Sequence, residues 1–279
     1  MKYDAHTVEA AVAGKTLCIV GGVHGNEVAG IEAIKAIRSE FRANASIARG
    51  CLKTIIANTL AVEEKARAID LDLNRAFVDS NSTEYEAEYA DDLAQELDGV
   101  DFVLDIHSTS SWSPVFAAGA LTRKHIAFCA SLGVETFTTG WSAPRNHGML
   151  IDEADRRGAV GLLVECGQHH DPSTIKKAIE CCMRAMIFVG MIEEPTVHEA
   201  VPTLLSVEKI VKAVNAPIVM ARGFRNLERV PGGTVVCRYA GKPWIAYSDF
   251  SILIPAQDRV VPIGNDAFAV GRDISKPVS

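Results

Sequence analysis

Two hydrophobic periodicities alternate along the first two-thirds of the chain. Short apolar, β-branched runs indicate buried strands, whereas apolar residues that recur every three or four positions indicate helices. An apolar run over residues 16–20 ends in a glycine pair, and helical spacing follows over residues 27–38, which predicts a strand, a tight loop and a helix. The same pattern predicts further strands over residues 52–57, 102–106, 115–118 and 160–164, and helices over residues 84–97, 123–132 and 173–189.

This alternation of strands and helices predicts an α/β fold with a mostly parallel mixed sheet flanked by helices. The pattern changes after residue 194, where an acidic pair is followed by proline and then by short β-branched runs. Turn sequences rich in glycine and proline separate these runs, which is typical of a β-rich region. We therefore expect two domains, one over residues 1–195 and a smaller β-rich C-terminal domain over residues 196–279.

Composition and charge narrow the range of partners. The 279 residues are 48% hydrophobic and 23% charged, as in an ordinary folded protein. A net charge of -7 argues against nucleic acid as the main partner, because phosphate binding requires a basic face. The N-terminal residues lack a secretion signal, and no stretch reaches the roughly 18 apolar residues of a membrane span. We expect no membrane association and a cytoplasmic location.

The seven cysteines point to the same compartment. Their number is odd, and Cys181 and Cys182 are adjacent rather than spaced as a metal-binding pair. Cysteines of this kind are typical of a reducing compartment, where they act as small buried hydrophobic residues. We expect no disulfides.

The candidate chemistry begins with two histidines and a glutamate. His24 and Glu27 lie three residues apart in a glycine-flanked loop after the first predicted strand, and His107 follows the apolar run over residues 102–106. Neighbouring parallel strands place their carboxyl ends at one edge of a sheet. Two imidazoles and a carboxylate can bind one zinc ion and leave its fourth position open, as a hydrolase needs. This combination predicts a zinc site, with manganese and cobalt as alternatives.

Two further carboxylates lie on predicted strands. Glu165 follows the apolar run over residues 160–164, and a buried carboxylate there is costly unless it has a task or a partner. Catalysis as a general base is the favoured interpretation, and a structural salt bridge is the alternative. Asp105 points to the same side of its strand as His107, so it either orients an imidazole or caps a neighbouring loop.

The segment Ile-Asp-Leu-Asp-Leu-Asn-Arg-Ala-Phe over residues 69–77 completes a family pattern. With it, the chain resembles the succinylglutamate desuccinylase and aspartoacylase family, zinc amidohydrolases that share the catalytic-domain fold of the zinc carboxypeptidases. Four motifs occur in the family's order between residues 17 and 167: Gly-Gly-x-His-Gly-Asn-Glu, Asp-Leu-Asn-Arg, Asp-Ile-His and Val-Glu-Cys-Gly. The resemblance is weak beyond Pro195.

The resemblance implies roles for individual residues. It makes His24, Glu27 and His107 the ligands of one zinc ion per chain and Glu165 the catalytic glutamate. It also assigns three residues to substrate: Asn74 and Arg75 would bind a carboxylate, and Arg67 would lie near the scissile carbonyl. The guanidinium fork of Arg75 suits a planar carboxylate. A surface turn at Asn74 and Arg75 and a solvated Arg67 are the alternatives.

Other positions depart from the family. A second substrate-binding arginine can be placed only at Arg156 or Arg157. The tyrosine that closes the site from the second domain in aspartoacylases has no clear equivalent. His169 and His147 are candidates for shaping the pocket, with packing or surface roles as the alternative. The acyl group, the amino acid and the closing residue of the C-terminal domain therefore stay open.

The resemblance implies zinc-dependent removal of the acyl group from a small anionic N-acyl amino acid. Zinc-bound water would attack the amide carbonyl, with Glu165 as general base and then acid and Arg67 stabilising the oxyanion. A β-rich domain that caps the active site would admit only small substrates. The alternatives are a zinc carboxypeptidase acting on peptides and a non-catalytic metal-binding regulatory protein. Homologues that form dimers or tetramers make a homo-oligomer an expectation by analogy.

Overall fold

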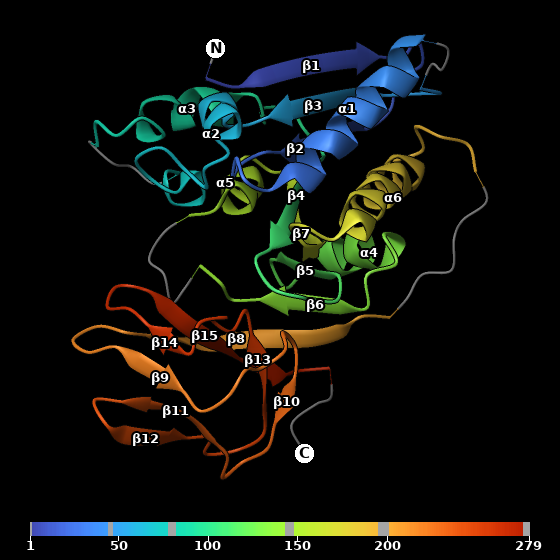
Figure 1. Cartoon of the computed structure of the whole chain (residues 1–279). Coiled ribbons are helices and arrows are strands. Elements are labelled where there is room, and N and C mark those ends of the chain that lie inside the picture. Colours follow the sequence, from blue (N-terminus) through green and yellow to red (C-terminus); the bar gives the residue numbers. More distant parts are fainter. Residues whose placement is uncertain (1, 44–46, 78–81, 143–147, 195–200, 276–279) are drawn as a thin grey trace.

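The computed structural model describes residues 2–43, 47–77, 82–142, 148–194 and 201–275. Strands and helices alternate over the N-terminal two-thirds, and the C-terminal third is made of strands (Figure 1). The N-terminal elements are β1 (Asp4–Glu9), β2 (Thr16–Gly21), α1 (Val28–Ala43), β3 (Cys51–Ile56), α2 (Thr59–Glu64), the 3-10 turn η1 (Leu73–Arg75), α3 (Ala87–Gln95), β4 (Phe102–Thr109), β5 (Phe116–Gly119), α4 (Arg123–Ser131), β6 (Thr136–Thr139), α5 (Leu150–Arg156), β7 (Val160–Gln168) and α6 (Pro172–Phe188). The C-terminal elements are β8 (Thr203–Lys212), β9 (Ile218–Met220), β10 (Arg229–Val230), β11 (Val235–Tyr239), β12 (Lys242–Ile245), β13 (Phe250–Leu253), β14 (Val260–Val261) and β15 (Asp266–Asp273).

One large mixed sheet organises the molecule. Its order is β1-β3-β2-β4-β7-β5-β6-β8-β15-β13-β10. The strands β3, β2, β4 and β7 are parallel, as expected from their nearly continuous apolar runs, and β1 and β5 are antiparallel to their neighbours. The predicted fold class is thus confirmed.

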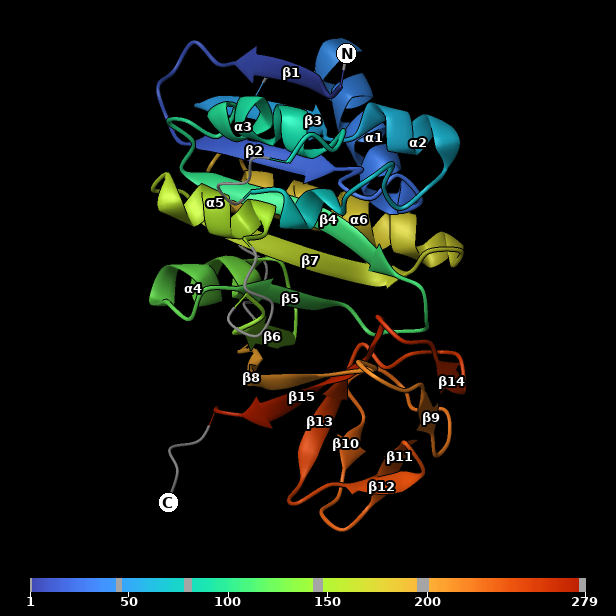
Figure 2. The ribbon, with the colours of Figure 1, turned by 90° about the vertical axis from the view of Figure 1, so that its left-hand side faces the viewer.

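Helices cover both faces of this sheet (Figures 1 and 2). Each face has its own apolar core. Helices α1, α4 and α6 pack on one face, where Ile34, Phe128 and Met186 are buried in a common cluster. Helices α3 and α5 pack on the other, around Leu93 and Leu150. The central strands are therefore buried on both sides, which holds their carboxyl ends rigidly in place.

Several predicted boundaries shift by a few residues. Strand β4 continues beyond residue 106 and β7 beyond residue 164, so His107 and Glu165 lie within strands rather than after them. Helix α1 begins one residue after Glu27. The edge strand β1 was not predicted, because its sequence is largely polar rather than an apolar run. The short strand β6 and the short helices α2 and α5 were not predicted either, because each is too brief to show a clear period.

The C-terminal strands continue the main sheet rather than forming a detached unit. Strand β8 pairs with β6 in parallel, and β15, β13 and β10 extend the same sheet antiparallel to one another (Figure 2). A four-stranded sheet, β12-β11-β9-β14, encloses a separate apolar core that includes Phe250 and Phe268. The boundary predicted between residues 195 and 196 falls outside the described residues and stays a prediction. In the part of the chain that the structure describes, no helix is long and apolar enough to cross a membrane.

Candidate active site

The β2–α1 loop places His24 and Glu27 at the carboxyl edge of the sheet. Its glycines make this possible. Gly22 has a φ of 68°, in the left-handed region that glycine tolerates. A Cβ on Gly25 would lie 2.0 Å from the carbonyl carbon of Ala61 in α2, so only glycine fits there. The loop is thereby packed tightly against α2, and His24 and Glu27 are both buried.

His24, Glu27 and His107 converge as predicted. All three are buried, and one ligand atom from each lies within 4.8 Å of the others. The Glu27 carboxylate lies between the imidazoles, with Oε1 2.7 Å from Nδ1 of His24 and Oε2 2.9 Å from Nδ1 of His107. Burial alone would raise the pKa of Glu27, but the two imidazoles hold it well below its ordinary value. The three side chains therefore form one electrostatic unit.

A second carboxylate lies behind each imidazole. Asp72 Oδ1 is 3.0 Å from Nε2 of His24, and Asp105 Oδ2 is 2.9 Å from Nε2 of His107. Burial opposes protonation of His107, but Asp105 and Glu27 raise its pKa well above the usual value. Asp105 therefore orients an imidazole, one of the two roles expected for it.

These contacts allow a test of whether the residues fit a metal ion. Outer carboxylates that bind one ring nitrogen are the usual support for metal-binding histidines, because they fix the ring and direct the other nitrogen to the ion. Here both Nδ1 atoms face the same carboxylate, and the donor set is two nitrogens and one carboxylate. The site therefore fits a metal with three protein ligands.

Asp72 also positions Arg67. Its Oδ2 accepts a hydrogen bond of 2.9 Å from Nη2 of Arg67, whose Nη1 lies 3.5 Å from Oε1 of Glu27. We call His24, Glu27 and His107 the candidate metal-binding cluster. The Arg67 side chain is 53% exposed, yet its guanidinium is held at the rim of this cluster rather than solvated freely. The role of Asp72 was not predicted, although Asp72 is the first residue of the Asp-Leu-Asn-Arg motif.

The turn η1 brings Asn74 next to the metal-binding cluster. Asp72 caps the turn by accepting the Asn74 N–H at 2.9 Å. Asn74 is only 2% exposed, its Oδ1 accepts the N–H of Leu150 at 3.0 Å, and its Nδ2 lies 3.4 Å from Nε2 of His107. The segment is therefore not the solvated surface turn considered as an alternative.

Arg75 lies beside Asn74 and lines the same cavity. Its Nη1 donates to the backbone carbonyl of Asn74 at 2.6 Å. Burial lowers the pKa of Arg75 from its ordinary value, opposed by the charge of Asp72. A guanidinium at the cavity wall is suited to an anionic ligand.

Glu86 anchors the segment that carries these residues. Its buried carboxylate accepts the backbone N–H groups of Ile69, Asp70 and Leu71 at 2.7, 3.1 and 3.0 Å. It also accepts from Nδ2 of Asn58 at 3.0 Å. Glu86 was not predicted to be buried, because a glutamate in a polar stretch of sequence does not indicate burial.

Glu165 lies on β7 directly opposite His107 of β4. Burial and the nearby charge of Glu27 raise the pKa of Glu165 to about 7. Its Oε2 is buried without a hydrogen-bond partner, and no cation within the described residues forms an ion pair with it. The carboxylate faces the cavity beside the metal-binding cluster without being one of its three members.

The structure does not bring Arg156 and Arg157 to this site. Arg156 donates to the carbonyl of Phe77 at 2.7 Å and to Glu153 of α5. Arg157 pairs with Glu153 and Asp98. Neither arginine lines the cavity. Both instead brace α5 against its neighbours.

Of the two histidines considered for the pocket, His169 lines it and His147 lies outside the described residues. Nδ1 of His169 is 2.8 Å from Oγ of Ser108. Burial lowers the pKa of His169, which favours the neutral imidazole. The backbone N–H of Ser108 donates to Glu27 at 2.9 Å. Ser108 therefore links His169 to the metal-binding cluster through hydrogen bonds.

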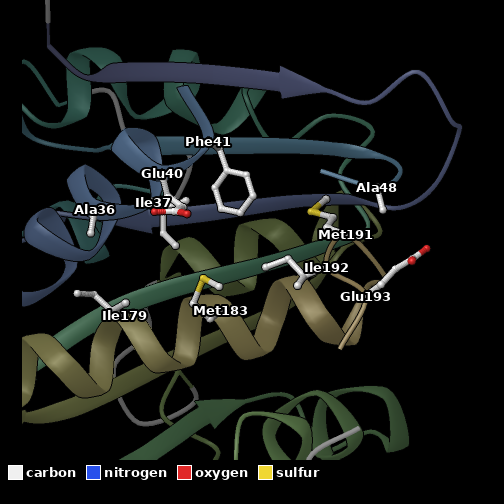
Figure 3. A pocket seen from close by; sticks show the side chains of 10 residues that line it. All are labelled: Ala36, Ile37, Glu40, Phe41, Ala48, Ile179, Met183, Met191, Ile192 and Glu193. Carbon is white, nitrogen blue, oxygen red and sulfur yellow. The ribbon is translucent and has the colours of Figure 1, made fainter. Parts of the chain in front are cut away.

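A cavity of about 190 Å³ unites these side chains. We call one part of it the metal end, which comprises His24, Glu27, Arg67, Asn74, Arg75, His107 and Glu165. The C-terminal strands reach the cavity through Ile254. A larger cavity of about 610 Å³ lies between α1 and α6, where Ile37, Phe41 and Met183 line it (Figure 3). That groove contains no cluster of metal-binding side chains among the described residues, so the chemistry belongs to the smaller cavity.

Comparison with curated proteins finds relatives over a short segment. An N-acyl-aromatic-L-amino acid amidohydrolase from Xenopus tropicalis is 36% identical over 107 residues, 33% of each chain. An aspartoacylase from Danio rerio is 36% identical over 113 residues, 35% of each chain. A probable aspartoacylase from Trichodesmium erythraeum is 37% identical over 105 residues, 34% of this chain and 36% of that one. The match thus spans about a third of the length of these relatives.

Solved structures share the fold over nearly the whole chain. Succinylglutamate desuccinylase from Vibrio cholerae superposes with a TM-score of 0.81 at 19% identity, covering 99% of this chain and 92% of that one. A succinylglutamate desuccinylase/aspartoacylase from Rhodobacter sphaeroides gives a TM-score of 0.75 at 17% identity, covering 98% and 89%. The C-terminal strands are therefore part of the shared fold.

The family model described as the succinylglutamate desuccinylase/aspartoacylase catalytic domain matches residues 13–187. That range contains every side chain of the metal end, together with the motifs on which the resemblance was based. The chain belongs to the succinylglutamate desuccinylase/aspartoacylase family.

Proposed function

We propose that the protein is a zinc-dependent amidohydrolase that removes the acyl group from a small N-acyl amino acid. The observation that carries the proposal is the convergence of His24, Glu27 and His107 beside Glu165, a buried carboxylate that is not a ligand. Hydrolysis at a three-ligand metal site needs such a group to accept a proton. We propose one zinc ion per chain, held by these three residues.

Zinc bound there would polarise the amide carbonyl and lower the pKa of water toward neutrality. Glu165 accepts a proton from the attacking water and returns it to the leaving amine. Its raised pKa, about 7, suits both transfers, because a group that titrates near the working pH can accept and donate. Arg67, fixed by Asp72, stabilises the negative charge that develops on the carbonyl oxygen.

Arg75 and Asn74 hold the carboxylate of the substrate in this proposal. Both line the cavity, and Asn74 lies within 3.4 Å of the ring of His107. A carboxylate bound there places the adjacent amide over the metal end, so that the reacting groups are held in position for attack. The substrate is accordingly a small anion, although the protein itself is acidic.

The size of the cavity favours a small substrate over a peptide. Its volume is about 190 Å³, and Ile254 from the C-terminal strands narrows it. We propose that residues 1–195 carry the catalytic residues and residues 196–279 form a cap over the site. A carboxypeptidase acting on long peptides would need an open groove instead.

The test is a turnover screen with the zinc-loaded chain. The panel contains acetyl, succinyl and formyl derivatives of acidic, basic and neutral amino acids, together with short peptides. We expect release of amino acid from at least one acylated amino acid. Glu165→Gln should lower kcat/KM by about 10³-fold, as expected for loss of general-base catalysis, with zinc content unchanged.

The matched control is Glu180→Gln. Glu180 is an exposed residue on α6 that does not line the cavity, so this variant should retain wild-type turnover. If only peptides were cleaved, the carboxypeptidase interpretation would replace the proposal. If zinc-loaded protein hydrolysed nothing in the panel, a non-catalytic metal-binding role would replace it.

A further inference from the structure

The part of the cavity away from the metal is apolar. Six side chains line it and define what we call the apolar end: Phe116, Ala118, Trp141, Met149, Leu163 and Ile254. All but Ile254 are buried. None of these six carries a charge, so this end offers dispersion contacts and desolvation rather than ion pairing.

The apolar end begins directly beside Glu165. Leu163 lies two positions before Glu165 on β7, so both side chains point to the same face of the sheet. On the neighbouring strand β5, Phe116 pairs with Glu165 and Ala118 pairs with Leu163. The wall therefore extends across the sheet from the proposed general base, on the side opposite to His107 on β4.

Trp141 is held in a fixed orientation with its polar atom satisfied. Its indole N–H donates to Oγ1 of Thr138 at 2.9 Å, and that hydroxyl donates to the carbonyl of Ala117 at 2.7 Å. The indole N–H is therefore paired within the protein, and the ring lining the cavity contributes apolar surface. A rigid aromatic wall loses little entropy when a ligand packs against it.

Ile254 completes the wall in a strained conformation. Its φ is 45°, a left-handed value that is rare for a β-branched residue. Asn226 helps to hold the backbone in this conformation. Its Oδ1 atom accepts the Ile254 N–H at 2.7 Å, and its Nδ2 atom donates to Oγ of Ser113 at 2.8 Å. Glycine would adopt this conformation without strain, so an isoleucine here points to a task for its side chain.

The carboxylate-binding residues adjoin the apolar end. Oδ1 of Asn74 accepts the N–H of Leu150, the residue after Met149. In an N-acyl amino acid the carboxylate and the side chain share one carbon atom. That carbon also carries the amide nitrogen. With the carboxylate held by Asn74 and Arg75 and the scissile amide at the metal end, the amino acid side chain is the substituent left to occupy the apolar end.

We propose that the apolar end binds the side chain of the substrate's amino acid, so that the enzyme prefers N-acyl derivatives of aliphatic and aromatic amino acids, with Ile254 as the specificity wall contributed by the C-terminal strands. The inference rests on the proposed function and extends it to a substrate class. An acidic side chain is disfavoured, because a carboxylate there would lose its hydration without gaining a cation from the six residues of the wall.

The experiment compares four substrates with the zinc-loaded chain: N-acetyl-L-leucine, N-acetyl-L-phenylalanine, N-acetyl-L-aspartate and N-acetylglycine. Burial of a large apolar side chain should raise kcat/KM by about 30-fold over N-acetylglycine. The leucine derivative should exceed the aspartate derivative by about 100-fold, because the six side chains of the apolar end offer no polar partner to a charge. Equal rates for leucine and glycine derivatives, or faster turnover of aspartate, would overturn the proposal.

Variants of Ile254 test the wall itself. Ile254→Gly should lower the ratio of kcat/KM between the leucine and glycine derivatives by about tenfold, whereas Ile254→Val should keep most of it. Ile263→Gly removes an exposed isoleucine from another loop of the C-terminal strands and is the matched control. If Ile254→Gly and Ile263→Gly gave the same ratio, Ile254 would not be a specificity residue.

Binding separates this inference from the proposed function. Isothermal titration of the zinc-loaded Glu165→Gln variant measures affinity for N-acetyl-L-leucine and N-acetyl-L-aspartate without turnover. If wild-type protein hydrolyses nothing but the variant binds the leucine derivative more tightly, the proposed function fails and the pocket assignment stands. If aspartate binds as tightly or more tightly, the pocket assignment fails whatever the activity.

Discussion

The two ends of the cavity differ in how much of their chemistry the sequence reveals. The metal end consists of polar residues from short motifs, each of a type rarely buried without a function. The apolar end consists of ordinary core residues from β5, β7 and the segment after β6, together with the more exposed Ile254 after β13, and nothing in their local sequence marks them as lining a cavity. Reaction type is thus readable from sequence, whereas substrate preference depends on which core residues face the cavity.

The largest effect is expected when a proposed metal ligand at the metal end is removed. His107→Ala should reduce bound zinc from one per chain to near zero and lower kcat/KM by about 10³-fold or more, because the water-activating ion is lost. Zinc content by elemental analysis and turnover measured in parallel check this. His170→Ala, an exposed histidine two residues after Gln168, should change neither. Full zinc occupancy in His107→Ala would remove His107 from the ligand set.

The next test concerns the carboxylates behind the imidazoles. Asp72→Asn should weaken zinc affinity by about 10- to 100-fold, the usual effect of losing an outer partner of a ligand histidine. Competition with a chromophoric chelator measures the affinity. Trp141→Phe, which alters only the apolar end, should leave zinc affinity at the wild-type value. A zinc affinity that responds equally to both changes would break the distinction between the two ends.

A smaller effect is expected at the anchor of the metal end. Glu86→Gln replaces an acceptor of three backbone N–H groups with an amide that cannot accept all of them. The free energy of unfolding should fall by about 2–3 kcal/mol, since buried donors lose their partner. Urea denaturation of the metal-free protein measures it. Glu88→Gln, an exposed neighbour paired with Lys2, should differ little from wild type.

The smallest effect is a pH dependence of stability in the metal-free protein. The pKa of Glu165 is raised to about 7 from an ordinary value of 4.5, chiefly by burial. Its stabilising contribution is therefore complete below the unfolded value and is lost as pH rises through the folded value. Glu165→Gln lacks this loss and should be more stable than wild type by about 2 kcal/mol near pH 8.

Denaturation curves of both proteins at intervals between about pH 3.5 and 8, from below the unfolded pKa to above the folded one, measure this difference. It should shrink to near zero at the acidic limit, where the wild-type carboxyl group is neutral. A difference that grows toward low pH would mean that the Glu165 carboxylate is stabilised by a partner instead of destabilised by burial.

The fold class was predictable because it depends on periodicity. Apolar runs with helices between them are sufficient for a parallel sheet covered on both faces, and the predicted strands and helices are present with small shifts. The shifts have a physical cause. Seven of the eight side chains of β4 are buried, so its sequence contains no alternation to mark where the strand ends, and it continues past His107.

Other features required spatial information. Arg156 and Arg157 resembled a substrate-binding pair in sequence, but both form ion pairs with Glu153 three and four residues earlier. Asp72 belongs to a recognised motif, but its contact with His24, 48 residues away, is not visible in that motif, and the partners of Glu86 lie 15 to 28 residues away. Ile254 is further still from the motifs, and its segment meets the cavity through tertiary contacts, among them the hydrogen bond of Asn226 to Ser113 and the packing of Leu253 in the same apolar cluster as Phe116.

The sequence by itself determined the α/β fold, the family and the convergence of two histidines and a glutamate at one sheet edge. Strand order in a parallel sheet places successive carboxyl ends together, so local motifs suffice to predict that convergence. Only the tertiary structure decided which carboxylates orient the imidazoles, which arginines face the cavity and which apolar side chains form its far wall. Those outcomes depend on distances between segments remote in the chain, which no local pattern encodes.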